Sequence, residues 1–350
     1  MSFPRAKAIP ALVSFTVAKA AGPVNVSRDS IEKDTRILRA DAAAIADAAG
    51  VLRAGGLAAF PTETVYGLGA RADDPRAIAA LYAAKGRPSF NPLIAHVRDL
   101  ADAKSLGNFS AEALVLAEKF WPGPLTIVVK ATSNESVCEL ARAGLDTVAI
   151  RVPSHEVARA LLAAVDFPIV APSANRSGHV SPTTAQHVAD DLTGKVDLIL
   201  DGGPSSGGIE STIVDFSGEK PRLLRSGGIA RSEIEKITGP LATASKSEVS
   251  APGMMASHYA PNARLRLDAL GANSNEAYLA FGPIPAAAQG AKKIMNLSSN
   301  GNLTEAAANL YAYLRALDSS GVEGIAVAPI PGESLGEAIR DRLARAAAPK

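Results

Sequence analysis

Polar side chains capable of binding a ligand follow directly after a short apolar stretch. Leu57–Phe60 has the composition of a buried strand and is stopped by a proline. Two threonines and a glutamate come next: Thr62, Glu63 and Thr64. In open α/β sheets, ligands bind outside the carboxyl ends of the strands. The sequence therefore predicts a site for a small polar molecule at this strand end, where Gly67 lets the backbone approach a ligand closely.

A cationic loop stiffened by prolines lies further along the same stretch. An Asp-Pro pair, a good N-cap and first helical residue, predicts a helix that ends at Lys85. Arg87 and Asn91 lie in the loop beyond it, and His96 lies in the apolar strand after the loop. A helix dipole alone favours cations at this position. The full pattern indicates a polyanion bound beside a small polar molecule.

Later stretches add more candidates for the same site. Arg151 lies inside the predicted strand Val148–Val152, where it faces either the solvent or the site. Ser173 follows another predicted strand in a Pro-Ser-Ala-Asn turn. Ser181 precedes a Pro-Thr pair that predicts the start of a helix, and the free N–H groups there can hold a phosphate. The sequence contains neither a P-loop motif nor a G-x-G-x-x-G motif that opens a helix.

The elements that must position these residues predict an α/β fold. Short strands alternate irregularly with helices, which favours a twisted mixed sheet with flanking helices over a regular βαβ repeat. Composition changes after residue 238, and a small C-terminal α/β (Rossmann-like) domain without an evident catalytic cluster is predicted at the end. The predicted divisions are a disordered leader (1–35), a catalytic domain (36–237), a linker or lid (238–262) and the C-terminal domain (263–346).

Length and composition limit the functions that this chain can have. Its 350 residues suit two domains, and 47% hydrophobic residues suffice for a sizeable core. The net charge of +1 gives no general signal for nucleic acid or an acidic membrane. The single cysteine, Cys138, excludes an internal disulfide and a multi-thiolate metal site. We expect a cytoplasmic protein that does not span a membrane, since no apolar run is long enough.

Several of these motifs, taken in order, resemble one known family. Besides the stretch from Pro61 to His96, they are Ala149–Pro153, Ala171–Gly178 and Glu210–Asp215. Over residues 36–237 the chain resembles the YrdC-domain threonylcarbamoyl-AMP synthases. A linker with Pro252-Gly253 and the C-terminal tail resemble the longer, two-domain branch of that family.

The resemblance implies a reaction and a set of site residues. The reaction joins L-threonine, bicarbonate and ATP into threonylcarbamoyl-AMP and pyrophosphate, with Mg²⁺ accompanying the ATP, for the t6A modification of tRNA. Lys85, Arg87 and Arg151 would be catalytic, and no metal ligands are assigned. The residues implied for the threonine pocket are Thr64, His96, Arg151, Ala171 and Ser211. Those implied for ATP are Arg87, Asn91, Thr147, Ser173, Ser181, Arg225 and Tyr259.

Partners and two alternatives complete these expectations. The product would pass to a tRNA-modifying complex, with a weak tRNA contact, and the linker would close over the site with Tyr259 reaching the nucleotide. One alternative is a double-stranded RNA or tRNA-binding module without catalysis, whose binding would weaken steeply with salt. The other is a carbamoyl-transfer domain of hydrogenase maturation. Its relatives carry zinc-finger segments, which a chain with one cysteine cannot form.

Overall fold

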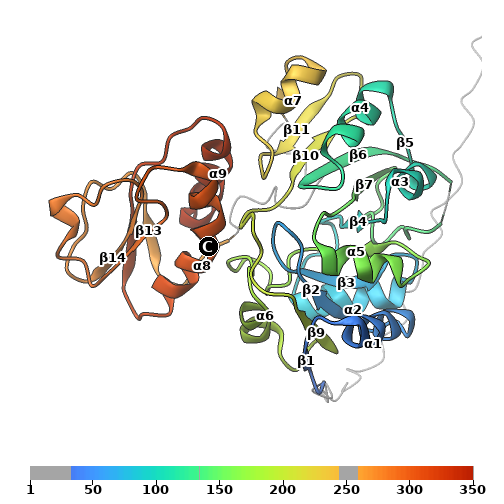
Figure 1. The fold of residues 1–350 in the computed structure, drawn as a ribbon, viewed down its shortest axis with the longest axis horizontal. Coiled ribbons are helices and arrows are strands. Elements are labelled where there is room, and N and C mark those ends of the chain that lie inside the picture. Colours follow the sequence, from blue (N-terminus) through green and yellow to red (C-terminus); the bar gives the residue numbers. More distant parts are fainter. Residues whose placement is uncertain (1–32, 134, 244–258, 350) are drawn as a thin grey trace, which may run out of the picture. The chain divides into compact units, whose positions relative to one another are not determined.

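The computed structural model describes residues 33–133, 135–243 and 259–349, and these form two separate sheets with helices. The larger sheet belongs to the first part of the chain, here called the large domain, and the smaller one to the C-terminal domain (Figure 1). The predicted leader lies outside the described residues up to residue 32. Most of the predicted linker, residues 244–258, also lies outside them.

The large sheet is mixed, as predicted, and has twelve strands in the described residues. Their order is β1-β9-β2-β3-β8-β4-β7-β6-β10-β11-β12, with β5 paired to β6. The pairs β2–β3, β3–β8, β4–β8, β6–β7, β5–β6 and β10–β11 are antiparallel, and the others are parallel. The strands are β1 (Arg36–Arg39), β2 (Ala58–Phe60), β3 (Gly67–Arg71), β4 (Ile94–His96), β5 (Gly107–Asn108), β6 (Leu125–Ala131), β7 (Thr147–Arg151), β8 (Ile169–Val170), β9 (Leu198–Asp201), β10 (Thr212–Asp215), β11 (Arg222–Arg225) and β12 (Ala242–Thr243).

Six of the seven described helices of the large domain begin at a side chain that accepts a hydrogen bond from a free N–H group. Asp41 accepts a hydrogen bond from the N–H of Ala44, and Asp74 accepts one from Arg76. The second of these helices ends at Gly86, whose φ of 59° favours glycine. The helices are α1 (Ala42–Arg53), α2 (Pro75–Lys85), α3 (Leu100–Leu106), α4 (Ala111–Phe120), α5 (Glu156–Ala163), α6 (Ala185–Leu192) and α7 (Arg231–Thr238).

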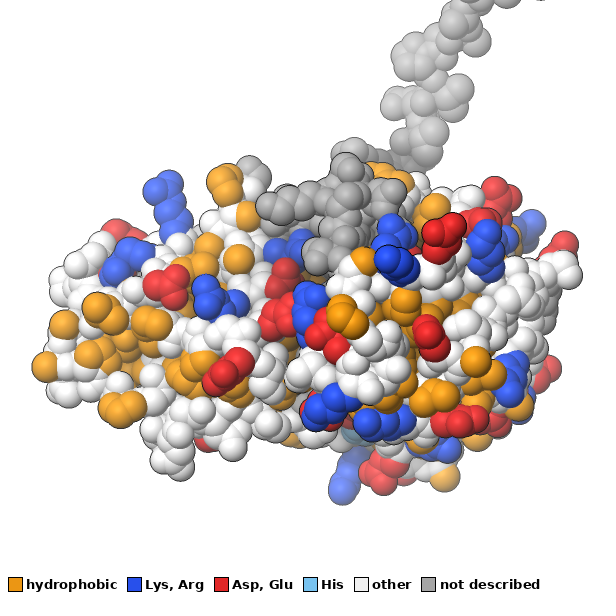
Figure 2. Space-filling model, turned by 90° about the horizontal axis from the view of Figure 1, so that it is seen from above, with side chains coloured by type: hydrophobic (Ala, Val, Ile, Leu, Met, Phe, Trp, Pro, Cys, Tyr) orange, Lys and Arg blue, Asp and Glu red, His pale blue; other side chains and the backbone are white. Residues whose placement is uncertain are grey.

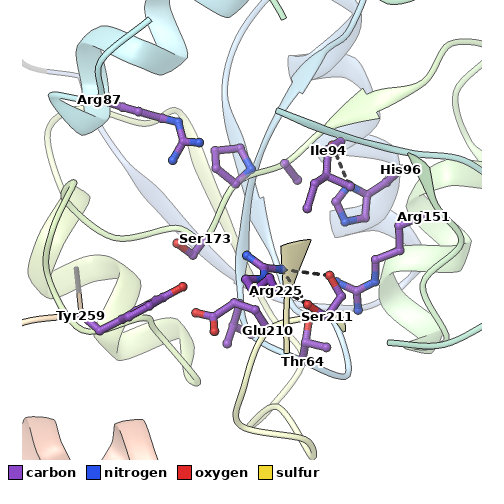
Figure 3. Close-up of a pocket in the computed structure, with 13 residues that line it drawn as sticks. Thr64, Arg87, Ile94, His96, Arg151, Ser173, Glu210, Ser211, Arg225 and Tyr259 are labelled. Atoms are coloured by element: carbon purple, nitrogen blue, oxygen red, sulfur yellow. Dashed lines mark hydrogen bonds between the residues drawn. The ribbon is translucent and has the colours of Figure 1, made fainter. Parts of the chain in front are cut away.

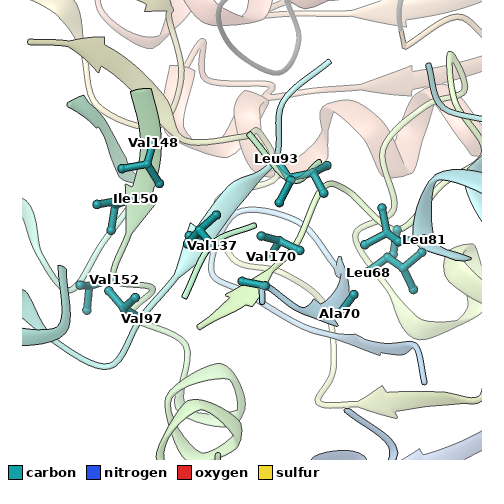
Figure 4. Packing of buried hydrophobic residues seen from close by; sticks show 14 of the residues in the cluster. Leu68, Ala70, Leu81, Leu93, Val97, Val137, Val148, Ile150, Val152 and Val170 are labelled. Atoms are coloured by element: carbon teal, nitrogen blue, oxygen red, sulfur yellow. The ribbon is translucent and has the colours of Figure 1, made fainter. Parts of the chain in front are cut away.

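Alternation along β7 divides the large sheet into a core face and a site face. Val148, Ile150 and Val152 are buried in the main hydrophobic cluster, with residues of β3, α2 and β8 (Figure 4). Because successive side chains of a strand point to opposite faces, Arg151 lies on the other face. Its direct partner across the parallel β4–β7 pairing is His96. The fold thus brings these two predicted residues side by side.

The C-terminal domain is a small parallel sheet with two long helices beside it. Its strand order is β13-β16-β14-β15, and all its pairs are parallel. Its hydrophobic cluster also includes Val65, Val180 and Ile209 of the large domain. The elements are β13 (Arg264–Arg266), β14 (Glu276–Ala280), η1 (Ala286–Ala288), β15 (Lys293–Asn296), α8 (Leu303–Asp318), β16 (Gly324–Val327) and α9 (Leu335–Ala347).

The structure corrects one predicted helix start that bears on the site. Helix α6 begins at Ala185 and its N-cap is Thr184, whose hydroxyl accepts from the N–H of His187 at 3.2 Å. The prediction placed this start at Ser181. That serine is fully buried and donates its proton to Glu210 instead, so it is not free to cap a helix. The helix start predicted at Ser181 is therefore wrong.

A second helix start is also shifted. In the sequence, Pro153 ends the predicted strand Val148–Val152 and the serine after it, Ser154, predicts the cap of the next helix, but the N-cap of α5 is His155. Its Nδ1 atom accepts from the N–H of Val157 at 3.2 Å.

Among the described residues, no helix is long and apolar enough to cross a membrane.

Candidate active site

One cavity on the site face of the large sheet collects most of the predicted residues (Figure 3). Strand ends and the loops that follow them supply its walls, as expected for an α/β sheet. In Figure 3, His96 and Arg151 lie on one side, and Arg87, Ser173 and Tyr259 lie on the other. The lining residues are Thr64, Val65, Arg87, Ile94, His96, Arg151, Ala171, Pro172, Ser173, Glu210, Ser211, Arg225 and Tyr259.

His96 enters the cavity as a neutral imidazole. Burial first and the nearby Arg151 second lower the pKa of His96 to about 3. The Nδ1 atom lies 3.1 Å from the carbonyl oxygen of Ile94. A carbonyl can only accept, so Nδ1 carries the proton and Nε2 is left as an acceptor. His96 therefore adds a polar acceptor to this side without adding charge.

Arg151 is held beside a buried carboxylate that the sequence analysis noted but gave no role. Its Nη2 atom lies 2.8 Å from Oε1 of Glu63, and its Nε donates to the carbonyl of Gly123 at 3.3 Å. Burial alone would raise the pKa of Glu63, but the Arg151 guanidinium outweighs this effect and keeps that pKa below its ordinary value. Among the described residues, neither Glu63 oxygen has a well-aligned hydrogen bond. The pair can therefore still bind a ligand.

Two further arginines supply positive charge to the cavity. Arg87 is nearly buried, and its guanidinium donates to the carbonyls of Asn91 and Pro92. Burial lowers its pKa to about 10, so it stays charged near neutral pH. Arg225 at the end of β11 donates to the backbone and side-chain oxygens of Ser211 at 2.9 and 3.0 Å. Such cations suit a phosphate-bearing ligand.

Among the described residues of the predicted linker, Tyr259 lines the cavity. It is 1% exposed and lies in the described residues just after the gap. Its ring stacks on Tyr311 of α8, with centroids 5.6 Å apart and planes 24° from parallel. An aromatic ring at a cavity wall can contact the base or ribose of a nucleotide.

Four predicted residues do not line the cavity. Lys85 is buried, and its ammonium group donates to the carbonyls of Ser173 and Asn175, so it holds the turn that carries Ser173. Burial and the neighbouring Arg87 lower the pKa of Lys85. The other three are Asn91, which is fully buried in its loop, Thr147 at the far end of β7, and Ser181 behind Glu210.

Besides Glu63, sequence reasoning did not assign a role to three residues that shape this site. Glu210 was noted only as part of a motif, and Arg342 and Tyr311 were not singled out. All three are buried, and Tyr311 and Arg342 of the C-terminal domain each donate a hydrogen bond to Glu210 of the large domain. One signal for them was present in the sequence. Arg342 lies in the final amphipathic helix, at a position where the helical pattern predicts burial.

The fold and the site together define an α/β enzyme that holds a small polar molecule beside a phosphate-bearing one. Comparisons with known proteins agree. The Sua5_yciO_yrdC family model, described as "Telomere recombination", matches residues 50–227. A second model, "Threonylcarbamoyl-AMP synthase, C-terminal domain", matches residues 229–348. The chain belongs to the Sua5/YrdC family of threonylcarbamoyl-AMP synthases, in the branch with the Sua5-type C-terminal domain, and is a nucleotidyltransferase.

Individual relatives match over most of their length. The threonylcarbamoyl-AMP synthase of Pyrococcus abyssi (strain GE5 / Orsay) is 42% identical over 318 residues, which covers 85% of this chain and 92% of the relative. That of Bacillus subtilis (strain 168) is 40% identical and covers 87% and 92%. The crystal structure of P. abyssi Sua5 complexed with L-threonine has a TM-score of 0.81 at 38% identity, covering 89% of this chain and 96% of that one.

Proposed function

We propose that the cavity binds L-threonine on the His96–Arg151 side and ATP on the Arg87–Arg225 side, and joins them with bicarbonate into threonylcarbamoyl-AMP. The observation that carries this proposal is the division of the cavity. One side pairs a neutral imidazole with a single guanidinium–carboxylate pair, and the other presents Arg87, which donates to backbone carbonyls, together with Arg225 and a tyrosine (Figure 3). The first suits a zwitterionic amino acid, and the second suits a triphosphate nucleotide.

On the threonine side, Arg151 would bind the carboxylate of the amino acid. His96 and Ser211 would form hydrogen bonds with its polar groups. The Ser211 Oγ atom also shares a hydrogen bond with the hydroxyl of Thr126 at 2.7 Å. Thr64 and Ala171 also line the cavity and would contact the threonine methyl and hydroxyl. A hydrophobic contact with a methyl group contributes only about 1–3 kcal/mol to discrimination. Serine should therefore be a poor substrate.

On the nucleotide side, Arg87 and Arg225 would bind phosphates, with Ser173 and Tyr259 beside them. Both atoms of the Asn91 amide are buried and have no hydrogen-bond partner among the described residues. Buried polar groups are normally satisfied, so this amide is a candidate for a ligand contact after a small movement of its loop. Lys85 would act by holding the Ser173 turn. The structure offers no direct support for a nucleotide contact by Thr147.

The reaction requires no nucleophile from the protein. The threonine amine attacks the carbon of bicarbonate or of CO₂ derived from it, and the resulting carbamate oxygen attacks the α-phosphorus of ATP. The bond to the β-phosphate oxygen breaks and pyrophosphate leaves with the electron pair. The contribution of the protein is to orient the reactants and to stabilise charge on the phosphates. Buried arginines at fixed positions perform both tasks.

Mg²⁺ is expected to accompany ATP, and the residues present fit an ion held mainly by the ligand. Among the described residues, no group of three or more His, Cys, Asp or Glu side chains could hold a metal. The carboxylates near the cavity, Glu63 and Glu210, are each paired with an arginine. The ion would therefore take its ligands from phosphate oxygens and water, as Mg²⁺ often does. It would neutralise phosphate charge there.

The product would pass to a tRNA-modifying complex in the cytoplasm, through at most a weak contact with tRNA. On the face that Figure 2 shows, acidic and basic side chains are interspersed. That mixture does not favour the alternative of an RNA-binding module without catalysis. We further propose the divisions 36–237, 238–262 and 263–346 as catalytic domain, linker or lid, and C-terminal domain.

Pyrophosphate release tests this function directly. We expect ATP-dependent release only when L-threonine and bicarbonate are both present, and much slower release with serine. Omitting each component in turn, with degassed buffer for the bicarbonate arm, gives the matched controls. Equal release without an amino acid would refute the substrate assignment. Salt-sensitive RNA binding without any release would instead favour the alternative.

A further inference from the structure

The cavity residue Tyr259 packs against two side chains of the C-terminal domain. Its ring stacks on that of Tyr311 in α8, with the ring centres 5.6 Å apart. The guanidinium of Arg342 in α9 lies over the ring of Tyr259, 5.3 Å from its centre. All three side chains are at most 1% exposed. Stacked rings and a cation over a ring face attract each other most strongly where water is excluded in this way.

Glu210 of the large domain orients both of these side chains. The Nε atom of Arg342 donates to Oε2 of Glu210 at 2.8 Å. The hydroxyl of Tyr311 donates to the two carboxylate oxygens at 3.1 and 2.9 Å. Burial would raise the pKa of Glu210, but Arg342 first and Arg225 second lower it to about 2, so the carboxylate stays charged. Hydrogen bonds to this carboxylate therefore fix Tyr311 and Arg342 where they meet the ring of Tyr259.

Tyr259 takes a backbone conformation that its surroundings must stabilise. Its φ is 63°, in the left-handed region that is unfavourable for a residue with a Cβ atom. Such a conformation persists where the contacts around it outweigh its cost. The N–H of the next residue, Ala260, donates to the carbonyl of Gly178 at 2.9 Å and ties the backbone to the large domain. The ring contacts with the C-terminal domain stabilise the side chain of the same residue.

We propose that Tyr311 and Arg342 form a seat for Tyr259, through which the C-terminal domain positions the aromatic wall of the nucleotide site. Neither residue of the seat lines the cavity, whereas Tyr259 does (Figure 3). Both are therefore positioning residues that act through Tyr259. A ring that is already held in place loses little conformational freedom when a base or ribose packs on it, which favours binding. The inference rests on the proposed binding of ATP at this cavity.

Docking of the two domains is the competing explanation, and α8 offers a control for it. Arg315 lies one turn beyond Tyr311 and forms an ion pair with Asp191 of the large domain at 2.7 Å. The two side chains are 16% and 8% exposed, and neither residue lines the cavity. Arg315→Gln therefore weakens docking at the same helix without removing a ring contact of Tyr259. Tyr311→Phe is a second control, because it removes the hydrogen bonds to Glu210 and keeps the ring.

The experiment measures the affinity of the full chain for a non-hydrolysable ATP analogue and for L-threonine by calorimetry. We expect Tyr311→Leu to weaken nucleotide binding about 10-fold, the effect of losing an ordered aromatic contact, with little change in threonine binding. Tyr311→Phe should recover most of this affinity, and Arg315→Gln should lower Tm with both affinities unchanged. The double variant Tyr259→Leu with Tyr311→Leu should bind the nucleotide as well as Tyr259→Leu alone, because the seat acts through Tyr259.

The outcomes separate the seat from the ATP site. Unchanged nucleotide affinity in Tyr311→Leu would overturn the seat, and so would a further loss in the double variant relative to Tyr259→Leu. Equal losses of both ligands in Tyr311→Leu and Arg315→Gln would show domain docking alone and overturn it too. If Tyr311→Leu does not fold, Arg342→Lys replaces it in the same comparison with Tyr259→Leu. Absence of nucleotide binding by the unmodified chain would instead refute the proposed ATP site.

Discussion

The Nη2 atom of Arg151 lies 2.8 Å from Oε1 of Glu63, on the face of the sheet that lines the cavity. Arg151 therefore shares its charge with a protein carboxylate before any ligand arrives. A substrate carboxylate must bind to the remaining donors of the guanidinium or displace Glu63 in part. The pair keeps a buried cation compensated in the empty site and still leaves it able to recognise an amino acid.

Glu63→Gln should lower the free energy of unfolding and increase the stabilisation that bound threonine provides. Removing one partner of a buried pair leaves an uncompensated charge, and we expect a loss of about 3–5 kcal/mol in the free energy of unfolding without ligand. Threonine would then be the only carboxylate available to Arg151, so its addition should raise Tm more than in the unmodified chain. Urea denaturation and thermal shift measure the two effects. Glu337→Gln, which breaks a partly exposed pair, should cost at most about 1 kcal/mol. Equal stability of the two variants would contradict this account.

His96 should make the fold less stable in mild acid. The pKa of His96 is lowered to about 3 in the folded chain, whereas an exposed imidazole titrates near 6.5. As pH falls below about 6.5, the unfolded chain takes up a proton that the folded chain does not, so stability is lost. Between pH 7 and 5 this amounts to about 2 kcal/mol. Urea denaturation at both pH values should show a smaller loss in His96→Gln. The same pH dependence in both proteins would show that His96 titrates normally.

Gly208 should be essential for docking the C-terminal domain. Its φ is 70°, and an added Cβ would lie 2.6 Å from the carbonyl oxygen of Ala308 in α8. Gly203 is a matched control, because its φ is 81° and a Cβ there meets nothing. We expect Gly203→Ala to cost about 1 kcal/mol from backbone strain alone and Gly208→Ala to cost about 3 kcal/mol. Equal costs in urea denaturation would mean that the contact with α8 is not tight in solution.

Local patterns sufficed to predict the elements on which the site is built. Asp74 and Gly86 mark the ends of α2 through short-range chemistry that the sequence displays, and the alternation in β7 places Arg151 opposite a run of core residues. The mixed sheet was also predictable, because short strands and hairpin-like returns exclude a regular βαβ repeat. In each case, the contacts that determine the feature join residues that are only a few positions apart in the sequence.

The contacts that sequence reasoning missed join residues far apart in the chain. Ser181 was expected to start a helix, but its hydroxyl is taken by Glu210, 29 residues away. Arg342 is 132 residues from Glu210, and no local pattern indicates which carboxylate a buried arginine will meet. Glu63 lies in an irregular turn, where the period of a strand or helix gives no direction for its side chain. For all three residues, three-dimensional packing determines which group the side chain meets.

The division of the cavity into two halves is tested most directly by calorimetry on Arg87→Ala and Arg151→Ala. Truncating one partner of a desolvated charge pair typically costs about 2–5 kcal/mol. Arg87→Ala should weaken binding of a non-hydrolysable ATP analogue by this amount and leave threonine affinity nearly unchanged. Arg151→Ala should do the reverse. Unchanged threonine affinity in Arg151→Ala, or loss of both ligands in each variant, would contradict the two-sided site.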